Sequence, residues 1–295
     1  IQWFPGHMAK TRRLIQDQVK LVDLVAEITD ARIPQSSRNP ELDKWVGGKR
    51  RLLVLNKCDA ADPGITARWL QYYQVTGVPA IAVDAKSGKG VGQFLPTVRE
   101  LLSDVTERLA RKGMVGRPLR MMIVGIPNVG KSSFINRVAK EKRARVEDRP
   151  GVTTGKQWIA VAKDVDLMDT PGILWPKFED PAVGEKLAFT GAVKDQIMDV
   201  ELLAVRLLGW LKEEYPALLE GRYRLTPADT AGREDYELLE LVGRKRGMLI
   251  SGGEVDTLRA ATMLLDEYRG GKLGRLSLEA PPRKEAGQWP STTTT

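Results

Sequence analysis

The residues best suited to chemistry lie in the stretch GIPNVGKSS, residues 125–133. Its two glycines allow a backbone in which successive N–H groups point into one concavity, where Lys131 can reach β- and γ-phosphates. The apolar run before it has the length of a strand, and residues 132–138 show a helical pattern, so a bound anion would lie at a helix N-terminus. The stretch predicts a phosphate-binding loop. Its expected ligand contacts are Asn128, Val129, Gly130, Lys131, Ser132 and Ser133.

A second phosphate-site signature, Asp169-Thr170-Pro171-Gly172, follows another short apolar run. An Asp at the carboxyl end of a strand can hold Mg²⁺, and a glycine lets its backbone N–H approach a γ-phosphate. Between the two signatures, the stretch RPGVTT offers Thr154 as a magnesium-binding threonine, with Thr153 as the second choice. The predicted magnesium ligands are therefore Ser132, Thr154 and Asp169. Lys131, Thr154 and Gly172 are expected beside the reacting phosphate.

The stretches NKCD and DAKSG predict which base is bound. The Asp59 carboxylate can accept from both N1–H and N2–H₂ of guanine, a pair of donors that adenine lacks. Lys57 can lie across the base, and Asn56 can connect this loop to the phosphate loop. Ala85 would direct its backbone N–H at guanine O6, with Lys86 stacking nearby. The expected ligands are therefore GTP and GDP rather than ATP.

Apolar runs alternate with helical patterns through the first 178 residues. Strands are expected at 22–29, 51–55, 80–83, 119–124, 156–162 and 165–168, and helices at 8–19, 63–74 and 91–112. This alternation predicts right-handed crossovers and an α/β domain with a mainly parallel six-stranded sheet that is covered on both faces.

The order of the motifs is unusual. In ordinary small GTPases the phosphate loop comes first, whereas here NKCD and DAKSG precede GIPNVGKSS and DTPG. The pattern predicts a circularly permuted P-loop GTPase domain over residues 1–178, including an N-terminal basic arm. Such a permutation is tolerated when the permuted termini lie close together at the surface. The DTPG segment then leads directly into the C-terminal part, so a nucleotide-driven change can pull on that part.

Residues 179–278 are expected to form a small all-helical domain. Helical spacing occurs at 181–194, 200–215, 235–242 and 254–268, with prolines and glycines between these runs. In the second run, the residues expected in the core are Leu202, Leu203, Val205, Leu207, Leu208, Trp210 and Leu211. Residues 279–295 are rich in Pro and Thr and show no periodicity, so a disordered tail is expected there.

Charge is distributed unevenly along the chain, whose formal net charge is +8 and whose pI is about 9.5. Residues 1–178 contain 30 Lys and Arg against 18 Asp and Glu, whereas residues 179–295 contain 16 against 20. Basic residues cluster at 10–13, 49–51, 140–145 and 244–246. Several clusters of one sign favour contact with nucleic-acid phosphates over ordinary solvated faces. Without an aromatic-rich RNA-reading motif, recognition of shape and backbone is expected.

Composition excludes several other classes of protein. No apolar run approaches the roughly 18 residues of a membrane helix, so no membrane partner is expected. One cysteine, Cys58, and one histidine exclude a disulfide framework and a protein-built Cys/His zinc site. A monomer in a reducing compartment such as the cytoplasm is expected. No signal peptide is visible, but the chain begins at Ile1 without a Met, so an organelle form with a trimmed leader is the alternative.

The chain resembles the YlqF/RbgA family of circularly permuted GTPases, which assist assembly of the large ribosomal subunit. The resemblance extends over nearly the whole chain and is carried by QWFPGHMAK, DARIP, NKCD, GIPNVGKSS, RPGVTTGKQW, DTPGILWPKF, KRGMLISGG and KLGRLSLE. It implies a GTPase that binds a late large-subunit precursor, through ribosomal RNA and ribosomal proteins, and leaves after RNA-stimulated hydrolysis. It also implies that the helical domain at residues 179–278 contacts RNA or the ribosome. The alternative is a GTP-regulated RNA-binding scaffold or checkpoint protein with incidental turnover.

Two residues are candidates for assisting hydrolysis. Many GTPases have a Gln directly after DxxG that orients the attacking water, but this chain has Ile173, so slow intrinsic hydrolysis is expected. A hinge at Pro5-Gly6 would let His7 swing toward the γ-phosphate, where a neutral imidazole can orient water. The alternative is a structural histidine. In GTPases that this chain resembles, an Asn at the position of Asn128 helps hold K⁺ beside the phosphates, and the alternative is a loop-bracing amide.

Overall fold

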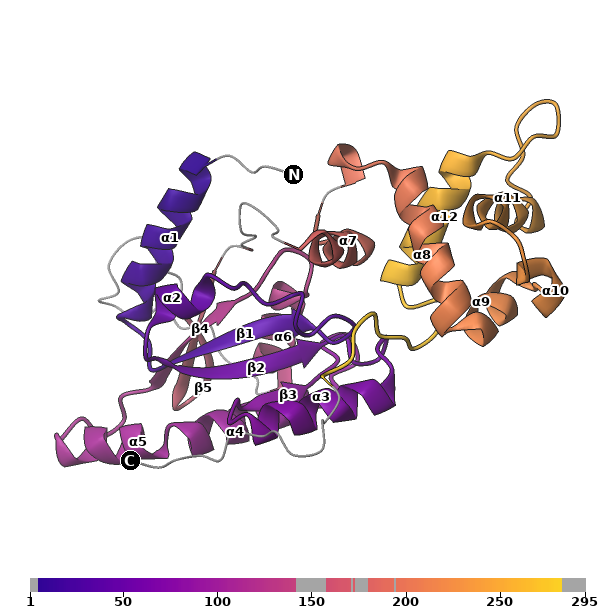
Figure 1. Ribbon diagram of the computed structural model, residues 1–295. Coiled ribbons are helices and arrows are strands. Elements are labelled where there is room, and N and C mark those ends of the chain that lie inside the picture. The colour runs from indigo at the N-terminus through magenta and orange to yellow at the C-terminus, as the bar shows by residue number, and fades with distance from the viewer. Residues whose placement is uncertain (1–4, 142–157, 171, 173–179, 194, 283–295) are drawn as a thin grey trace.

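A six-stranded sheet forms the centre of the N-terminal part of the molecule (Figure 1). The computed structural model describes residues 5–141, 158–170, 172, 180–193 and 195–282, with the backbone alone at 5–11, 141 and 197. The strand order is β3-β2-β1-β4-β6-β5. Only β5 runs antiparallel to its neighbour, so the predicted mainly parallel sheet is confirmed. The strands are β1 (Leu24–Asp30), β2 (Arg50–Asn56), β3 (Ala80–Ala82), β4 (Leu119–Val124), β5 (Trp158–Ala162) and β6 (Val165–Asp169).

Helices cover both faces of this sheet and make up the C-terminal part. In chain order they are α1 (Pro5–Val19), α2 (Leu42–Val46), α3 (Pro63–Val75), η1 (Val91–Gln93), α4 (Phe94–Leu101), α5 (Ser103–Arg111), α6 (Lys131–Glu141), α7 (Pro181–Phe189), η2 (Asp195–Ile197), α8 (Val200–Glu214), α9 (Pro216–Tyr223), α10 (Pro227–Thr230), α11 (Asp235–Lys245) and α12 (Thr257–Arg269).

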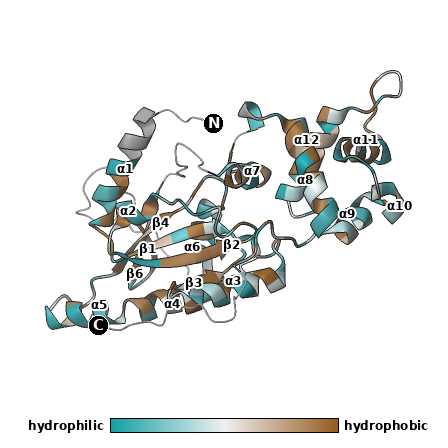
Figure 2. Ribbon diagram, viewed as in Figure 1, coloured by the Kyte–Doolittle hydropathy of each residue, from teal (hydrophilic) through white to brown (hydrophobic). Residues whose placement is uncertain are grey.

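The sheet is sandwiched because its strands are apolar on both sides. All seven residues of β1 are buried. On one face Ile28 belongs to a cluster with Phe94 and Phe134, whose rings meet edge to face at 4.9 Å. On the other face Val25 packs with Ile15 of α1, since successive side chains of a strand point to opposite faces. Figure 2 shows apolar residues along the sheet and a largely hydrophilic α5 at the periphery.

Several predicted helix boundaries differ from the observed ones. The helix predicted over 91–112 is interrupted at Leu102, where φ is −114° and ψ is 19°. The helix predicted to reach residue 194 ends at Phe189, because Gly191 adopts a left-handed conformation with φ +76° just after the end. The N-terminal helix begins at Pro5 rather than Met8, since Pro is compatible with the first turn of a helix. The predicted hinge at Pro5-Gly6 is therefore part of this helix.

The C-terminal helices pack around α8, which contacts α7, α9, α11 and α12. Leu203, Leu207, Leu208 and Leu211 of α8 are buried, as predicted. Leu202 is 49% exposed, so its predicted place in the core is wrong. It lies beside the buried stripe of the helix rather than within it. The short helices α2, α9 and α10 were not predicted, because each is too short to show a helical period.

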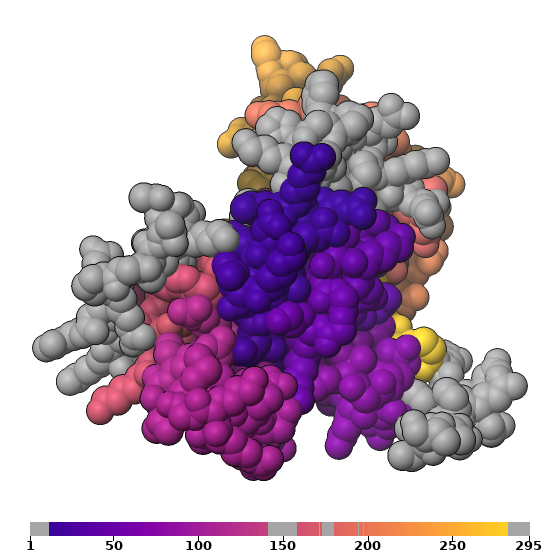
Figure 3. Space-filling view, turned by 90° about the vertical axis from the view of Figure 1, so that its left-hand side faces the viewer, coloured from indigo at the N-terminus to yellow at the C-terminus, as the bar shows by residue number. Residues whose placement is uncertain are grey.

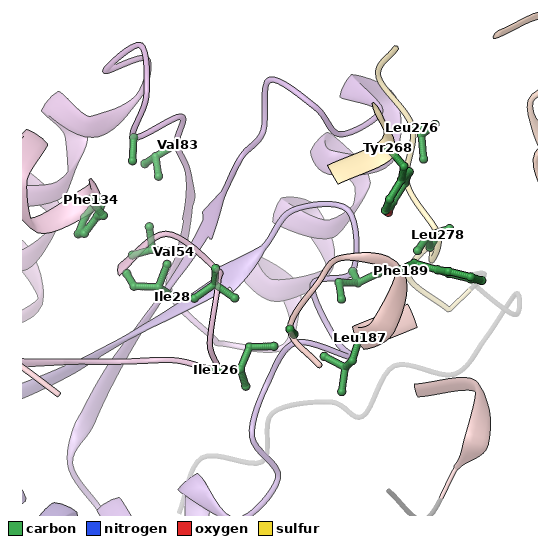
Figure 4. Packing of buried hydrophobic residues seen from close by; sticks show 14 of the residues in the cluster. Ile28, Val54, Val83, Ile126, Phe134, Leu187, Phe189, Tyr268, Leu276 and Leu278 are labelled. Atoms are coloured by element: carbon green, nitrogen blue, oxygen red, sulfur yellow. The ribbon is translucent and has the colours of Figure 1, made fainter. Parts of the chain in front are cut away.

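One hydrophobic cluster connects the sheet to the C-terminal helices. Figure 4 shows Ile28, Val54 and Phe134 of the first part in the same cluster as Phe189 and Tyr268 of the second. The chain then returns to the first part after α12. Glu279 accepts hydrogen bonds from Ser36, so the disordered tail expected from residue 279 does not begin there. Residues 283–295 of that tail lie outside the described residues.

None of the helices in the described part of the chain combines the length and apolar character needed to cross a bilayer.

Candidate nucleotide site

The predicted motifs meet at the carboxyl edge of the parallel strands. The phosphate loop leaves β4, which lies between β1 on one side and β6 on the other. Chain segments depart in opposite directions from this point of the sheet, which is where open α/β folds bind ligands. Gly125 is required by close packing, because a Cβ there would lie 2.5 Å from the Ile28 carbonyl oxygen. Gly130 has φ +91°, and a Cβ there would lie 2.5 Å from Asn56 Nδ2.

Lys131 lies at the centre of this loop. Its Nζ donates to the carbonyl oxygens of Gly125 at 3.2 Å and Ile126 at 3.3 Å. Burial lowers the pKa of Lys131, and the neighbouring Asp169 carboxylate opposes part of that shift. A phosphate oxyanion beside this ammonium would favour its charged form further.

The DTPG segment approaches the same point from β6. A Cβ on Gly172 would lie 3.0 Å from Lys131 Nζ and 3.0 Å from Pro127 Cα, so only a glycine fits without displacement of the loop. Thr170 fixes the segment by donating its hydroxyl to the Ile123 carbonyl oxygen at 2.7 Å. Asp169 is exposed at the end of β6. Three predicted residues, Lys131, Asp169 and Gly172, are thus brought together.

Ser132 and Ser133 begin the exposed side of α6, directly after Lys131. Only 2% of the surface of Val129 is exposed. Its side chain therefore belongs to the core, and only its backbone can face a ligand. Hydroxyl and carboxylate oxygens are the donors that Mg²⁺ prefers. Ser132 and Asp169 provide such donors on the two segments that flank the phosphate loop.

Asn56 connects three loops. Its Nδ2 donates to the Val129 carbonyl oxygen at 2.8 Å, and its Oδ1 accepts from the Ala85 backbone N–H at 3.0 Å. The Ala85 N–H predicted for guanine O6 is therefore engaged by Asn56 in this structure, and a base contact requires sharing or exchange of that donor. The side chain is 2% exposed, so these bonds are protected from water.

Lys57 reaches across from the base loop to the phosphate loop. Its Nζ donates to the Asn128 carbonyl oxygen at 2.6 Å and lies 3.1 Å from Asp30 Oδ2. Both Lys57 and Asn128 have φ +61°, a left-handed conformation that is uncommon outside glycine. Asp59 is exposed two residues later, where its carboxylate is accessible to a ligand.

Sequence reasoning missed Asp30, a fully buried carboxylate at the end of β1. Burial raises the pKa of Asp30, but the charges of Arg32 and Lys57 and hydrogen bonds from Arg32 outweigh burial and hold the pKa well below its usual value. Asp30 therefore stays ionised and can fix the Lys57 ammonium. The sequence does contain a sign of this role. Asp30 begins the stretch DARIP at the end of one strand, and the carboxyl end of that strand adjoins the carboxyl end of the strand that leads into NKCD.

The loop at residues 84–88 is also braced by residues that were not predicted. Asp84 accepts from the backbone N–H of Lys86 at 2.8 Å. Arg137 of α6 donates to the Ala85 carbonyl oxygen at 3.1 Å and also to that of Lys86. No sequence pattern pairs Arg137 with this loop, because the two meet only through packing of α6.

Asn128 contacts the loop that follows α7 in the C-terminal part. Its Nδ2 donates to the Gly191 carbonyl oxygen at 2.6 Å, which leaves Oδ1 as an oxygen donor for another group. A cavity of about 540 Å³ adjoins this contact. Its lining residues are Lys57, Asn128, Thr190, Gly191, Val193, Asp195, Gln196 and Arg269.

The structure does not describe the side chains of two predicted site residues, Thr154 and His7. Thr154, with its alternative Thr153, lies outside the described residues, as does Ile173. The His7 backbone lies in the first turn of α1, and its side chain is outside the described part.

The side chains of the basic cluster at residues 49–51 are bonded to other groups of the protein. Lys49 Nζ donates to the Val22 carbonyl oxygen at 2.7 Å, Arg50 pairs with Asp104, and Arg51 pairs with Glu27. Groups that are already paired are less available to nucleic-acid phosphates, so this cluster is a weaker RNA-binding candidate than its sequence indicates.

Comparison with known proteins identifies the family. Residues 120–214 match the family described as 50S ribosome-binding GTPase. Ribosome biogenesis GTPase A of Priestia megaterium is 49% identical over 288 residues, which cover 97% of this chain and 98% of that protein. The chain belongs to the ribosome biogenesis GTPase A family. The predicted resemblance is confirmed.

More distant members of the ribosome biogenesis GTPase A family are also similar to this chain in sequence and structure. The Thermotoga maritima protein of that name is 30% identical over 282 residues, which cover 95% of each chain. The crystal structure of GNP-bound YlqF from T. maritima is similar with a TM-score of 0.65 at 26% identity, covering 92% of this chain and 98% of that one.

The Gly130 contact in this family member gives a first test. Gly130→Ala forces a Cβ to within 2.5 Å of Asn56 Nδ2, whereas Gly77→Ala, also at positive φ, meets nothing within 4 Å. Gly77→Ala should lose about 1 kcal/mol of unfolding free energy, because L side chains disfavour left-handed backbone. Gly130→Ala should lose more, because its Cβ also displaces the buried Asn56 amide. Only Gly130→Ala should lose GDP affinity, by at least about tenfold. Urea unfolding and calorimetric titration measure the two effects, and equal GDP affinity in both variants would contradict the proposed role of the Asn56 bridge.

Proposed function

We propose that this chain binds GTP at the carboxyl edge of its sheet and hydrolyses it to GDP and phosphate. The observation that carries the proposal is the approach of Gly172 to Lys131 and Pro127, which brings both phosphate-site signatures to one point. Membership in a GTPase family supports it. In this proposal Lys131 neutralises charge on the β- and γ-phosphates, and the Gly172 backbone N–H donates to the γ-phosphate.

Ser132, Thr154 and Asp169 are proposed as the magnesium ligands. The exposed oxygens of Ser132 and Asp169 fit a hard divalent cation. When bound, Mg²⁺ supplies positive charge at the phosphate oxygens. Val129, Gly130 and Ser133 complete the phosphate contacts through their backbone N–H groups.

Guanine is proposed to lie against Lys57, with Asp59 accepting its two donors, Ala85 at O6 and Lys86 over the ring. Asn56 acts by positioning this loop. Its contacts to the Val129 carbonyl oxygen and the Ala85 N–H support that role.

The variant Asp59→Asn should change the preferred base from guanine to xanthine. The amide can still accept from N1–H, but its NH₂ repels the guanine amino group and suits the C2 carbonyl of xanthine. GDP affinity should fall about 100-fold through loss of charge-assisted hydrogen bonds. Xanthosine diphosphate affinity should rise, while ADP stays weakly bound by both proteins. Titration of the three diphosphates measures this, and unchanged GDP affinity would remove Asp59 from the site.

Asn128 is proposed to hold K⁺ beside the phosphates, where the ion would supply the positive charge of an arginine finger. Its Oδ1 fits this role, because the Nδ2 end of the amide is already directed at Gly191. The alternative is that Asn128 only braces the phosphate loop against the C-terminal helices.

Exchange of potassium for sodium separates these two roles. If Asn128 holds K⁺, sodium should lower GTP turnover about tenfold or more, and Asn128→Ala should remove the difference between the ions. Asn136→Ala, at an exposed position of α6, is the matched control and should keep the potassium dependence. A wild-type rate that is equal in both salts would exclude the potassium role.

The proposed partner is a precursor of the large ribosomal subunit, through its RNA and proteins. We assign residues 1–178 to the permuted GTPase domain and 179–278 to the helical domain that contacts the particle. A late assembly step and release after RNA-stimulated hydrolysis are parts of this proposal. The net positive charge of +8 and the family name support it. The protein would act as a monomer in the bacterial cytoplasm, with an organelle form as the alternative.

Turnover with and without purified large subunits tests this proposal. Large subunits should raise the GTP hydrolysis rate, and His7→Ala should lower the stimulated rate about 100-fold at unchanged GTP affinity, as expected for a residue that orients water. Asp17→Ala, exposed on the same helix, is the control. Stimulation that survives in His7→Ala would show that the histidine is not catalytic. No stimulation at all would favour the alternative, a GTP-regulated scaffold with incidental turnover.

A further inference from the structure

A short segment after the last helix returns to the GTPase domain. We name residues Arg275–Glu279 the C-terminal strap. In Figure 3 the yellow C-terminal end of the described chain lies against the purple surface of the first domain. Leu276 and Leu278 of the strap are buried, with 1% and 7% of their surfaces exposed. The strap is therefore packed against the domain that the chain left about a hundred residues earlier.

The strap binds the backbone of the loop that carries Asp59. The guanidinium of Arg275 donates to the Cys58 carbonyl oxygen at 3.0 Å and to the Ala61 carbonyl oxygen at 3.1 Å. These two acceptors lie on either side of Asp59 in the chain. One guanidinium thus bridges the turn that presents the guanine-binding carboxylate.

Neighbouring strap residues extend this attachment. The Leu276 N–H donates to the Ala60 carbonyl oxygen at 3.0 Å. Ser277 Oγ accepts from the Asp62 N–H at 3.1 Å, at the residue that caps α3. Every residue from 58 to 62 other than Asp59 itself therefore has a backbone hydrogen bond to the strap.

The strap also holds the loop that follows β1. The Leu278 N–H donates to the Arg32 carbonyl oxygen at 2.9 Å, and Glu279 accepts from both the N–H and the hydroxyl of Ser36 at 2.9 and 2.6 Å. Arg32 in turn pairs with Asp30, which contacts Lys57. Two independent connections thus run from the strap to the guanine-reading residues.

We propose that the C-terminal strap is a structural part of the guanine site, with Arg275 as a positioning residue for Asp59. A surface loop is mobile unless its backbone groups are held, and a carboxylate must be oriented to accept two donors at once. The strap supplies that restraint from the far end of the chain, so base affinity depends on a segment outside the GTPase motifs. This inference rests on the proposed contact between Asp59 and guanine.

The variant Arg275→Met/Ser277→Ala, made in the whole chain, removes the side-chain hydrogen bonds from the strap to residues 58–62 and leaves those of Glu279 in place. The probes are GDP and inosine diphosphate, which lacks the N2 amino group and so reports on one of the two Asp59 contacts. GDP affinity should fall about tenfold, as expected for loss of two to three hydrogen bonds. The preference for GDP over inosine diphosphate should fall at least about threefold, because a poorly oriented carboxylate gains less from the second donor.

Arg222→Met is the matched control, since Arg222 pairs with Glu267 inside the helical domain. It should leave GDP affinity and base preference unchanged. If the strap variant stays folded and keeps its GDP affinity and its preference for GDP over inosine diphosphate, the inference is overturned. An equal loss of affinity for both nucleotides, together with a lower melting temperature, would also overturn it, because the strap would then only stabilise the fold. A wild-type protein without preference for GDP would contradict the role of Asp59 itself.

Discussion

One side-chain amide determines how the loops of the site lie relative to one another. Asn56 is 2% exposed and uses both ends of its amide, toward Val129 in the phosphate loop and Ala85 in the loop after β3. Hydrogen bonds buried in this way are strong, and breaking one leaves an unpaired polar group. Gly130 has no side chain because this amide occupies the space. The position of Asn56 thus requires a glycine at 130, whereas the Ile28 carbonyl oxygen requires the one at 125.

A buried charge provides the second restraint. Asp30 is surrounded by protein, so its carboxylate must be paired, and Arg32 and Lys57 are its partners. Lys57 also binds the Asn128 carbonyl oxygen, and both residues adopt left-handed backbone. Such conformations cost on the order of 1–3 kcal/mol each and persist only where surrounding contacts fix them. The ion pair and the amide together provide these contacts.

The circular permutation explains why the C-terminal helices adjoin this site. The DTPG segment leads toward α7, and the loop after α7 accepts a hydrogen bond from Asn128. At the other end, Arg32 donates to the Tyr268 carbonyl oxygen at 2.9 Å, close to the start of the strap. The helical part therefore contacts the phosphate loop on one side and the loop after β1 on the other. A shared hydrophobic cluster, visible in Figure 4, reinforces both attachments.

The sequence by itself determined the mainly parallel sheet, its six strands and the motifs at its edge, because strand length, apolar runs and glycine spacing are local properties. The positions of β4 and of the glycines at 125 and 130 follow directly from such patterns. Tertiary structure alone decided the partner of the Ala85 N–H, the ion pair at Asp30 and the bridge by Arg275. Each of these joins groups far apart in the sequence or fixes a side chain by burial, and local patterns do not encode which distant backbone oxygen a donor meets after packing.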